Sequence, residues 1–366
     1  MEIFNNYHFG NYVFVICTSI LISFLAIPSI LHVARARHLY DDIGHFRKQH
    51  DHGIPRLGGV AIFVSFCITL LIFSVTDKSF SITYLLISAI ILFAMGLKDD
   101  LSGVNSSTKF LIQFIVSLNL VVLGDIRLTS MYGILGIYDL PYFISVCLSI
   151  LTIMMIVNAL NLIDGIDGLA ATTGIIANSA FAALFIYIHH GELAIISIAL
   201  VGAIIGFLKF NITPAKIFMG DTGSLLIGLI SAVMAIKLIE LNKFADGHTP
   251  QIYSAPALTV AILIGPIFDT LRIFFIRVKN GVSPFEADRN HIHHRMLRLG
   301  FTHMQTTLIF AIINIFAIVV VLLFGSYGNS ILVFGIFAFS TVFNWLVTFF
   351  LRSKEREGLA LRNFIV

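Results

Sequence analysis

The chain has 366 residues, of which 58% are hydrophobic and only 12% are charged, and its formal net charge at pH 7 is +3. Soluble globular domains carry about 25% charged residues, so this composition excludes an ordinary soluble protein and indicates a protein of the lipid bilayer. Membrane lipid is therefore the expected surrounding, and no nucleic-acid partner is expected.

Apolar runs recur along the whole chain at a length suited to membrane helices. A helix needs about 20 apolar residues to cross about 30 Å of hydrocarbon, and it satisfies its own backbone groups there. We predict an all-α, polytopic transmembrane bundle of about eleven spans. Their limits are 11–34, 58–76, 81–98, 109–124, 142–161, 168–188, 192–209, 223–241, 254–278, 304–325 and 330–351. No linker divides the chain, so residues 1–366 are expected to form a single membrane domain.

The basic residues are distributed unevenly between the two sides of these spans. Of the 23 Lys and Arg residues, all but Lys78, Arg127, Lys237 and Lys243 lie in or beside alternate loops and the C-terminal tail. Because cytoplasmic loops retain basic residues, the sequence predicts an outside N-terminus and a cytoplasmic C-terminus. The cytoplasmic loops, at about 35–57, 99–108, 162–167, 210–222 and 279–303, carry nearly all the unusual polar residues, and the active site is expected there.

The first cytoplasmic loop ends in a basic turn, Pro55-Arg56-Leu57-Gly58-Gly59. Two roles fit Arg56 about equally: an anchor that keeps the loop cytoplasmic, and a contact to phosphate.

The second loop opens with two adjacent carboxylates, Asp99 and Asp100, where the third span meets the cytoplasm. Two negative charges so close repel each other unless a cation lies between them. A solvated helix cap would explain the pair on its own, whereas a divalent ion would explain it together with the acids of the later loops.

The third loop has two Asp-Gly steps, at Asp164 and Asp167, at the end of an apolar span. Asn161 stands three residues before the first of them. Glycine permits tight turns, and Asp and Asn supply the hard oxygens that Mg²⁺ or a ligand's hydroxyl groups need. The twelve-residue oxygen pattern of an EF-hand is absent, which argues against a calcium loop.

The fourth loop reads Phe218-Met219-Gly220-Asp221-Thr222-Gly223-Ser224 before the chain re-enters the membrane. Asp221 at a helix start is placed to reach a metal, while the neighbouring N–H groups point at an anion. Phe218 could stack on a nucleobase, although an aromatic residue at a membrane boundary is more often interfacial packing.

The fifth loop holds three histidines within four residues, followed by arginine: His291, His293, His294 and Arg295. The spacing fits neither a zinc finger nor a metalloprotease helix. Interleaved histidine and arginine donors suit a diphosphate or the oxygens of a sugar. Together the five loops fit Mg²⁺, with Mn²⁺ as an alternative, and a nucleotide diphosphate, with an acceptor dissolved in the membrane.

At this point the chain resembles the polyprenyl-phosphate N-acetylhexosamine-1-phosphate transferases of glycosyltransferase family 4. The ordered set Pro-Arg-x-Gly-Gly, Asp-Asp, Asn-x-x-Asn-x-x-Asp-Gly-x-Asp-Gly, Phe-x-Gly-Asp-x-Gly-Ser and His-x-His-His carries the resemblance, from about residue 50 to 300. It implies that a cytoplasmic UDP-N-acetylhexosamine gives its sugar-1-phosphate to undecaprenyl phosphate in the bacterial inner membrane. The products would be a lipid diphosphate sugar and UMP.

Within this family the chain is most similar to the WecA and TagO branch, which starts O-antigen, enterobacterial common antigen or teichoic acid lipids. The peptidoglycan branch, the phospho-MurNAc-pentapeptide transferases, carries an uninterrupted His triplet. Here Ile292 interrupts the histidines, and an eleventh predicted span follows. A peptidoglycan role is therefore an alternative, and a membrane transporter is the alternative from another class. A homodimer is a further open possibility.

The resemblance also implies a role for each matching residue. Asp99 and Asp100 would be the catalytic pair, and Asp221 with Asn161 would hold Mg²⁺. The substrate contacts would be Arg56, Asp164, Asp167, Phe218, His291, His293, His294 and Arg295. Two routes fit these residues: direct attack of the lipid phosphate, positioned by Asp99, on the β-phosphorus, and a phosphorylated aspartate intermediate. Asp269 and Arg272, three residues apart in the ninth span, are expected to form a structural ion pair near the site.

Overall fold

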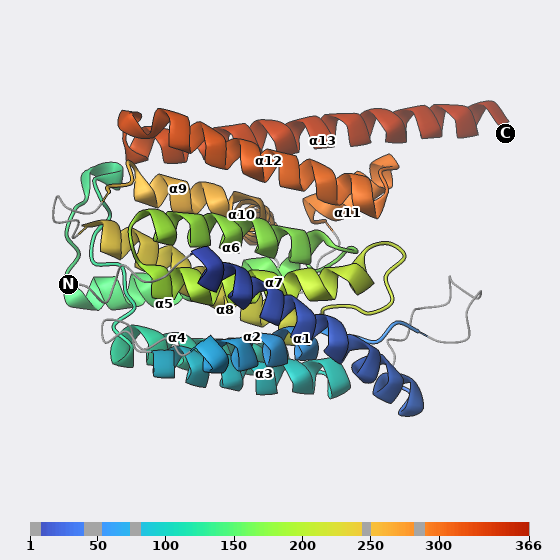
Figure 1. Cartoon of the computed structure of the whole chain (residues 1–366). Coiled ribbons are helices and arrows are strands. Elements are labelled where there is room, and N and C mark those ends of the chain that lie inside the picture. The colour runs from blue at the N-terminus through green and yellow to red at the C-terminus, as the bar shows by residue number, and fades with distance from the viewer. Residues whose placement is uncertain (1–8, 40–52, 74–81, 244–249, 282–289, 366) are drawn as a thin grey trace, which may run out of the picture.

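The computed structural model is a bundle of long helices that run in alternating directions (Figure 1). It describes residues 9–39, 53–73, 82–243, 250–281 and 290–365, the last nine of them as backbone only. The first helices are α1 (Phe9–Ala36), α2 (Gly58–Phe73), α3 (Ile82–Ser102), α4 (Ser106–Leu118), α5 (Tyr142–Leu162), α6 (Leu169–Tyr187) and α7 (Gly191–Asn211). They are followed by α8 (Gly220–Lys243), α9 (Ala255–Ile262), α10 (Ile264–Lys279), α11 (Ile292–Leu299), α12 (His303–Phe324) and α13 (Asn329–Ile365).

The predicted all-α class is confirmed, and the described part of every predicted span lies mainly on helix. Among the described residues, nine helices are long and apolar enough to cross a membrane, or ten if α9 and α10 form one broken span. The remaining predicted span is α2, whose described part has 16 residues. The chain is therefore a multi-pass membrane protein, while the count of eleven spans and the orientation of the termini stay predictions.

The ninth predicted span is broken, which the sequence analysis did not foresee. α9 and α10 meet at an angle of 77°. Pro266 has no N–H to donate to the carbonyl of Ile262, four residues earlier, which interrupts the helix at this point. The side-chain amide of Asn314 in α12 donates to that carbonyl at 3.0 Å, so the freed acceptor is satisfied inside the protein as a bilayer requires.

The most deeply buried helices are α7 and α8, which lie at the centre of the bundle with α3 and α4 on one side and α12 and α13 on the other (Figure 1). Small residues allow α1 to pack closely on α7: a Cβ at Gly206 would lie 2.7 Å from the Ile20 carbonyl oxygen. Close backbone approach at glycine, together with buried hydroxyl pairs such as Ser19 and Ser65 at 3.0 Å, is typical of membrane helix packing.

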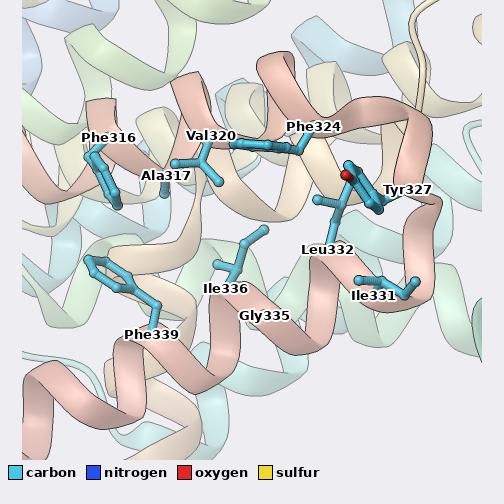
Figure 2. A pocket seen from close by; sticks show the side chains of 10 residues that line it. All are labelled: Phe316, Ala317, Val320, Phe324, Tyr327, Ile331, Leu332, Gly335, Ile336 and Phe339. Atoms are coloured by element: carbon cyan, nitrogen blue, oxygen red, sulfur yellow. The ribbon is translucent and has the colours of Figure 1, made fainter.

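An apolar cavity of about 410 Å³ lies between α12 and α13 (Figure 2). Phenylalanine and aliphatic side chains from both helices line it, and Tyr327 contributes the one hydroxyl group. The lining residues are Phe316, Ala317, Val320, Phe324, Tyr327, Ile331, Leu332, Gly335, Ile336 and Phe339. The cavity contains none of the predicted site residues, so the chemistry has to be sought at the other end of α12.

Candidate active site

The first and fourth predicted loops pair through their backbones. The N–H of Phe218 donates to the Pro55 carbonyl at 2.9 Å, and the N–H groups of Gly58 and Gly59 donate to the carbonyls of Phe218 and Met219 at 2.9 and 2.8 Å. A Cβ at Gly59 would lie 2.1 Å from the backbone nitrogen of Gly223, so only glycine fits. The Pro-Arg-x-Gly-Gly turn therefore brings the Arg56 backbone to the start of α8.

The start of α8 is capped by an aspartate from another helix. The Asp100 carboxylate, at the end of α3, accepts from the N–H of Asp221 at 2.8 Å, and from the N–H and hydroxyl of Thr222 at 3.0 and 2.5 Å. The first N–H groups of a helix have no partner within it, and a carboxylate there also meets the positive end of the helix dipole. Asp100 thus joins α3 to α8 and orients the residue that follows Gly220.

Asp99, Lys109 and Asp221 form the charged centre of the site. The Lys109 ammonium, from α4, lies 2.7 Å from an oxygen of Asp99 and 2.7 Å from an oxygen of Asp221. The N–H of Val104 donates to the other Asp99 oxygen at 2.7 Å. The three charged side chains are only 15% to 26% exposed, so solvent screens them weakly. One ammonium bridges two carboxylates, and Asp100 adds a third carboxylate nearby, which leaves the cluster with a net negative charge.

This cluster has the donor chemistry of a divalent-metal site. Ligand atoms of Asp99, Asp100 and Asp221 all lie within 4.8 Å of one another. Carboxylate oxygens are the ligands that Mg²⁺ prefers, and the ion binds through one or two of them while keeping water or phosphate on its other positions. A cation already bridges Asp99 and Asp221 in the form of Lys109, which shows that the space between them suits positive charge.

Asn161, at the end of α5, lies beside Asp221 as the metal assignment requires. Its side-chain amide donates to an Asp221 oxygen at 3.0 Å and to the Ser224 hydroxyl at 2.9 Å. In this arrangement Asn161 orients the Asp221 carboxylate, and its expected role as a ligand stays a prediction.

Asp164 lies in the turn between α5 and α6 and also reaches the start of α8, where the Gly220 N–H donates to it. Burial, followed by the negative charges of Asp221 and Asp100, raises the pKa of Asp164 to about 7, against the smaller opposing effect of Arg56. The carboxyl group therefore belongs to the same electrostatic cluster as the acids of α3 and α8.

Asp167, three residues later, bonds with other elements. It accepts from the Thr213 hydroxyl at 3.0 Å, and its second oxygen lies 3.3 Å from Nδ1 of His303 at the start of α12. Burial by itself would raise the pKa of Asp167, but the hydrogen bond and charge of His303, with Thr213, hold it below its ordinary value. Asp167 thus ties the third loop to α12, and its expected substrate contact stays a prediction.

The histidine motif lies on α11 and meets the turn at Asp164 and Gly165. A Cβ at Gly165 would lie 2.5 Å from Nε2 of His293 and 3.3 Å from Nε2 of His294. His293 is fully buried, and among the described atoms neither of its ring nitrogens has a hydrogen-bond partner. Burial, with the neighbouring His294, lowers the pKa of His293 to about 3, so its ring is neutral at pH 7. The histidines and the acids therefore share one region.

The expected Asp269–Arg272 ion pair is present at 2.9 Å, and it holds the start of α11. The Asp269 carboxylate also accepts from the Ile292 N–H at 3.1 Å and lies 3.0 Å from Nδ1 of His291. His291 thus points toward α10. The role that we predicted for it in binding diphosphate stays a prediction.

Three other predicted substrate contacts are Arg295, Phe218 and Arg56, of which Arg295 and Phe218 have no hydrogen bond to the acid cluster among those described. Arg295 is buried, and its guanidinium donates to the side chains of Asn344, at 2.8 Å, and Thr348, both on α13. Phe218 is half-buried at the start of α8, and Arg56 is exposed beside it. The phosphate role of Arg295 and the stacking role of Phe218 stay predictions.

The site includes residues that the motifs did not single out. Lys109 lies near the start of an apolar run, and Thr222 was one letter within a glycine-rich motif. Nothing in the sequence pattern marks His303. What these three residues share is their place in the helices, since each lies within a few residues of a helix end.

Comparison with known proteins finds similarity to transferases that act on polyprenyl phosphates. The model of glycosyl transferase family 4 matches residues 82–239. A decaprenyl-phosphate N-acetylglucosaminephosphotransferase of Mycolicibacterium smegmatis is 31% identical over 72% of this chain and 70% of its own length. A probable undecaprenyl-phosphate N-acetylglucosaminyl 1-phosphate transferase of Bacillus subtilis is 32% identical over 76% and 75%. The undecaprenyl-phosphate alpha-N-acetylglucosaminyl 1-phosphate transferase of Escherichia coli K12 is 29% identical over 72% and 71%.

Proposed function

Because the chain belongs to glycosyl transferase family 4, we propose that it transfers N-acetylglucosamine-1-phosphate from a UDP-sugar to undecaprenyl phosphate, releasing UMP. The reaction would be the first membrane step in making a cell-surface polysaccharide. It would take place at the cytoplasmic face of the bacterial inner membrane. The relatives act on N-acetylglucosamine by name, which favours this sugar over the phospho-MurNAc-pentapeptide alternative.

The observation that carries this proposal is the acid cluster at the end of membrane helices. Asp99, Asp100 and Asp221 lie within 4.8 Å of one another beside Lys109, on α3, α4 and α8. A site that must join a water-soluble diphosphate to a lipid phosphate needs positive charge for both, at the boundary of the membrane. An acid cluster that binds a divalent cation, with a lysine beside it, meets this need.

Asp221 and Asp99 would hold Mg²⁺, with Asp100 keeping Asp221 in place through α8. When bound, the ion would neutralise charge on the diphosphate of the donor. Asn161 would keep the Asp221 carboxylate turned toward the ion, since its amide donates to the oxygen that Lys109 does not contact.

For the transfer itself, the lipid phosphate oxygen would form a bond to the β-phosphorus of the donor, and the bond from that phosphorus to the bridging oxygen would break. UMP would leave with the bridging oxygen. Asp99 would position the lipid phosphate, and Lys109, which now bridges two carboxylates, would be available to the phosphates once a metal ion takes over that charge. His293 and His294 would face the sugar or the diphosphate beside Gly165.

The decisive experiment is UMP release from purified protein with undecaprenyl phosphate, Mg²⁺ and a panel of UDP-sugars that includes UDP-GlcNAc, UDP-GalNAc and UDP-MurNAc-pentapeptide. Release that depends on lipid, on metal and on both Asp99 and Asp221, tested as Asp99→Asn and Asp221→Asn, is the expected result. If folded wild-type protein binds a UDP-sugar but releases no UMP with any of them, the proposal is wrong. Labelled sugar phosphate trapped on the protein without lipid would replace direct attack by a covalent intermediate.

A further inference from the structure

α11, the short helix that carries the histidines, packs against α12 and α13 through its own set of hydrophobic contacts. Its apolar side forms a hydrophobic cluster of its own, in which Ile292, Met296 and Val347 of α13 are buried. Phe310 of α12 and Phe343 of α13 pack against this cluster. Leu297 of the same helix packs against the main core, so the position of α11 is set by that contact together with this smaller cluster.

Polar contacts from α13 fix the middle and the end of α11. The Arg295 guanidinium donates to Asn344 at 2.8 Å and also to the Thr348 hydroxyl. The Lys354 ammonium donates to the carbonyls of Arg298 and Leu299, at 3.1 and 2.8 Å. The last carbonyls of a helix have no partner within it and carry the negative end of its dipole, so a lysine there is a favourable cap.

The attachment from α13 matters because, on their other side, the histidines pack tightly against the turn at Gly165. Gly165 leaves only 2.5 Å between a built Cβ and Nε2 of His293, so any shift of α11 changes how the imidazoles meet the turn at Asp164. The N-terminal attachment, through Asp269 and Arg272, comes from α10. Further polar contacts to α11 come from α13, through Asn344, Thr348 and Lys354.

We propose that α13 is a positioning element, and that Asn344, Thr348 and Lys354 hold α11 so that His293 and His294 stay against the turn at Gly165. The proposal rests on the proposed function, in which these histidines face the donor. None of the three residues touches the acid cluster among the contacts of the described residues, so each acts through α11.

The contacts are local to one stretch of α13. Residues 344 to 354 face α11, whereas toward its beginning α13 is separated from α12 by the apolar cavity (Figure 2). In Figure 1 the C-terminal part of α13 runs on past α11. Loss of one polar contact in this stretch should shift α11 and leave the packing of the spans unchanged.

Lys354→Met and Asn344→Leu are the test variants, because each removes the polar contact and keeps most of the side-chain volume. Arg356→Met and Thr341→Val are the matched controls on the same helix: Arg356 is exposed, and Thr341 donates only to a carbonyl of its own helix, at 2.8 Å. Lys354→Arg keeps the cation and should behave as wild type. Two readouts are taken: the reaction of His293 with diethyl pyrocarbonate, by mass spectrometry, and KM and kcat for the UDP-sugar.

We expect His293, fully buried in the wild type, to become at least about threefold more reactive in Lys354→Met and more so in Asn344→Leu, which leaves a buried guanidinium short of an acceptor. The KM for the UDP-sugar should rise by about 3- to 10-fold in Lys354→Met, with a smaller change in kcat and an unchanged Mg²⁺ requirement. Unchanged His293 reactivity, or changed reactivity with unchanged KM, would overturn the proposal.

The histidine reaction needs no turnover. If wild-type protein released no UMP, the proposed function would fail, while the reactivity of His293 would still decide whether α13 positions α11. A uniform fall in kcat that follows the fraction of folded protein, with KM unchanged, would mean a purely structural role and would also overturn the proposal.

Discussion

The Asp100 carboxylate accepts two hydrogen bonds from Thr222, one from its N–H at 3.0 Å and one from its hydroxyl at 2.5 Å, and so fixes the end of α3 to the start of α8. Its neighbour Asp99 bonds instead to Lys109 and to the N–H of Val104. The two adjacent aspartates therefore have different surroundings. One belongs to the scaffold that aims Asp221, and the other faces the charged centre.

Because of this difference, we expect Asp100→Asn to affect mainly stability and Asp99→Asn to affect mainly activity. Asp100→Asn removes the charge at the start of α8 and should lower the free energy of unfolding by about 1 to 2 kcal/mol. Asp99→Asn should abolish UMP release with little change in thermal unfolding. Asp139→Asn, which removes an exposed carboxylate at the other end of the bundle, is the control and should leave both unchanged. Thermal unfolding in detergent and UMP release measure the two effects; a larger loss of stability in Asp99→Asn would contradict the assignment.

Lys109 bridges Asp99 and Asp221 at 2.7 Å to each, and it is a cation in the place where a divalent ion would bind. Lys109→Met should lower kcat for UMP release by about 100-fold, because a charge that stabilises the transferring phosphate is lost. Binding of Mn²⁺ as a probe metal should persist or become tighter, since the metal no longer competes with the ammonium. Lys98→Met, at an exposed position on α3, should behave as wild type. Wild-type turnover in Lys109→Met would remove Lys109 from the mechanism.

The membrane helices could be predicted because hydropathy is a local property. The described part of each predicted span lies mainly on helix, and the five motifs were expected at one end of the bundle. There the first, second and fourth motifs meet at the start of α8 with Asn161 and Asp164 of the third, while His293 and His294 lie beside Gly165. The break between α9 and α10 was missed. Pro266 is visible in the sequence, but the acceptor that it frees is satisfied by Asn314, 52 residues away from Ile262.

The partners of individual side chains were much harder to predict than the location of the site. Lys109 binds Asp221 across 112 residues of sequence, and no periodicity or motif relates the two. Arg295 stands within a histidine motif, and its expected partner was a phosphate. In the structure its guanidinium donates a hydrogen bond to α13. α11 is amphipathic, and the side that buries Ile292 and Met296 packs against Phe343 and Val347 of α13, which brings Arg295 to the same helix.

Gly220 should tolerate no side chain. Its φ is +72°, and a Cβ would lie 2.4 Å from the Arg56 carbonyl oxygen and 2.6 Å from an Asp100 oxygen. Gly220→Ala should therefore displace the cap on α8, lower the thermal unfolding temperature and lower UMP release by at least about tenfold. Gly335→Ala is the matched control, because a Cβ there meets nothing within 4 Å. Equal behaviour of the two variants would show that the start of α8 adjusts without consequence for Asp221.

The predicted orientation can be tested with single cysteines in a chain whose three natural cysteines have been replaced by serine. Lys216→Cys lies between α7 and α8, at the end of the bundle that holds the acid cluster, and Tyr138→Cys lies at the opposite end; both positions are exposed. A membrane-impermeant maleimide added to intact cells should label position 138 and not position 216. The reverse pattern would place the active site outside and would contradict a cytoplasmic UDP-sugar as donor.

Metal binding should depend on pH through Asp164, whose pKa in the metal-free protein is raised to about 7 by burial and by the charges of Asp221 and Asp100. Below that pH the Asp164 carboxyl group is protonated and neutral. A divalent ion that binds in the cluster must displace this proton before the negative charge of Asp164 can stabilise the ion. The apparent Mg²⁺ affinity should therefore rise with pH and level off above about 7, by at most about tenfold for each pH unit below it. Because folding raises the pKa of Asp164 from its ordinary value of 3.8, the stability of the protein without metal should fall as pH rises from about 4 to about 7 and level off above that pH. Calorimetric Mg²⁺ titrations between pH 6 and 8 in buffers of different ionisation enthalpy measure the proton release, which Asp164→Asn should lower most clearly near pH 7. An affinity independent of pH in the wild type would separate Asp164 from the metal cluster.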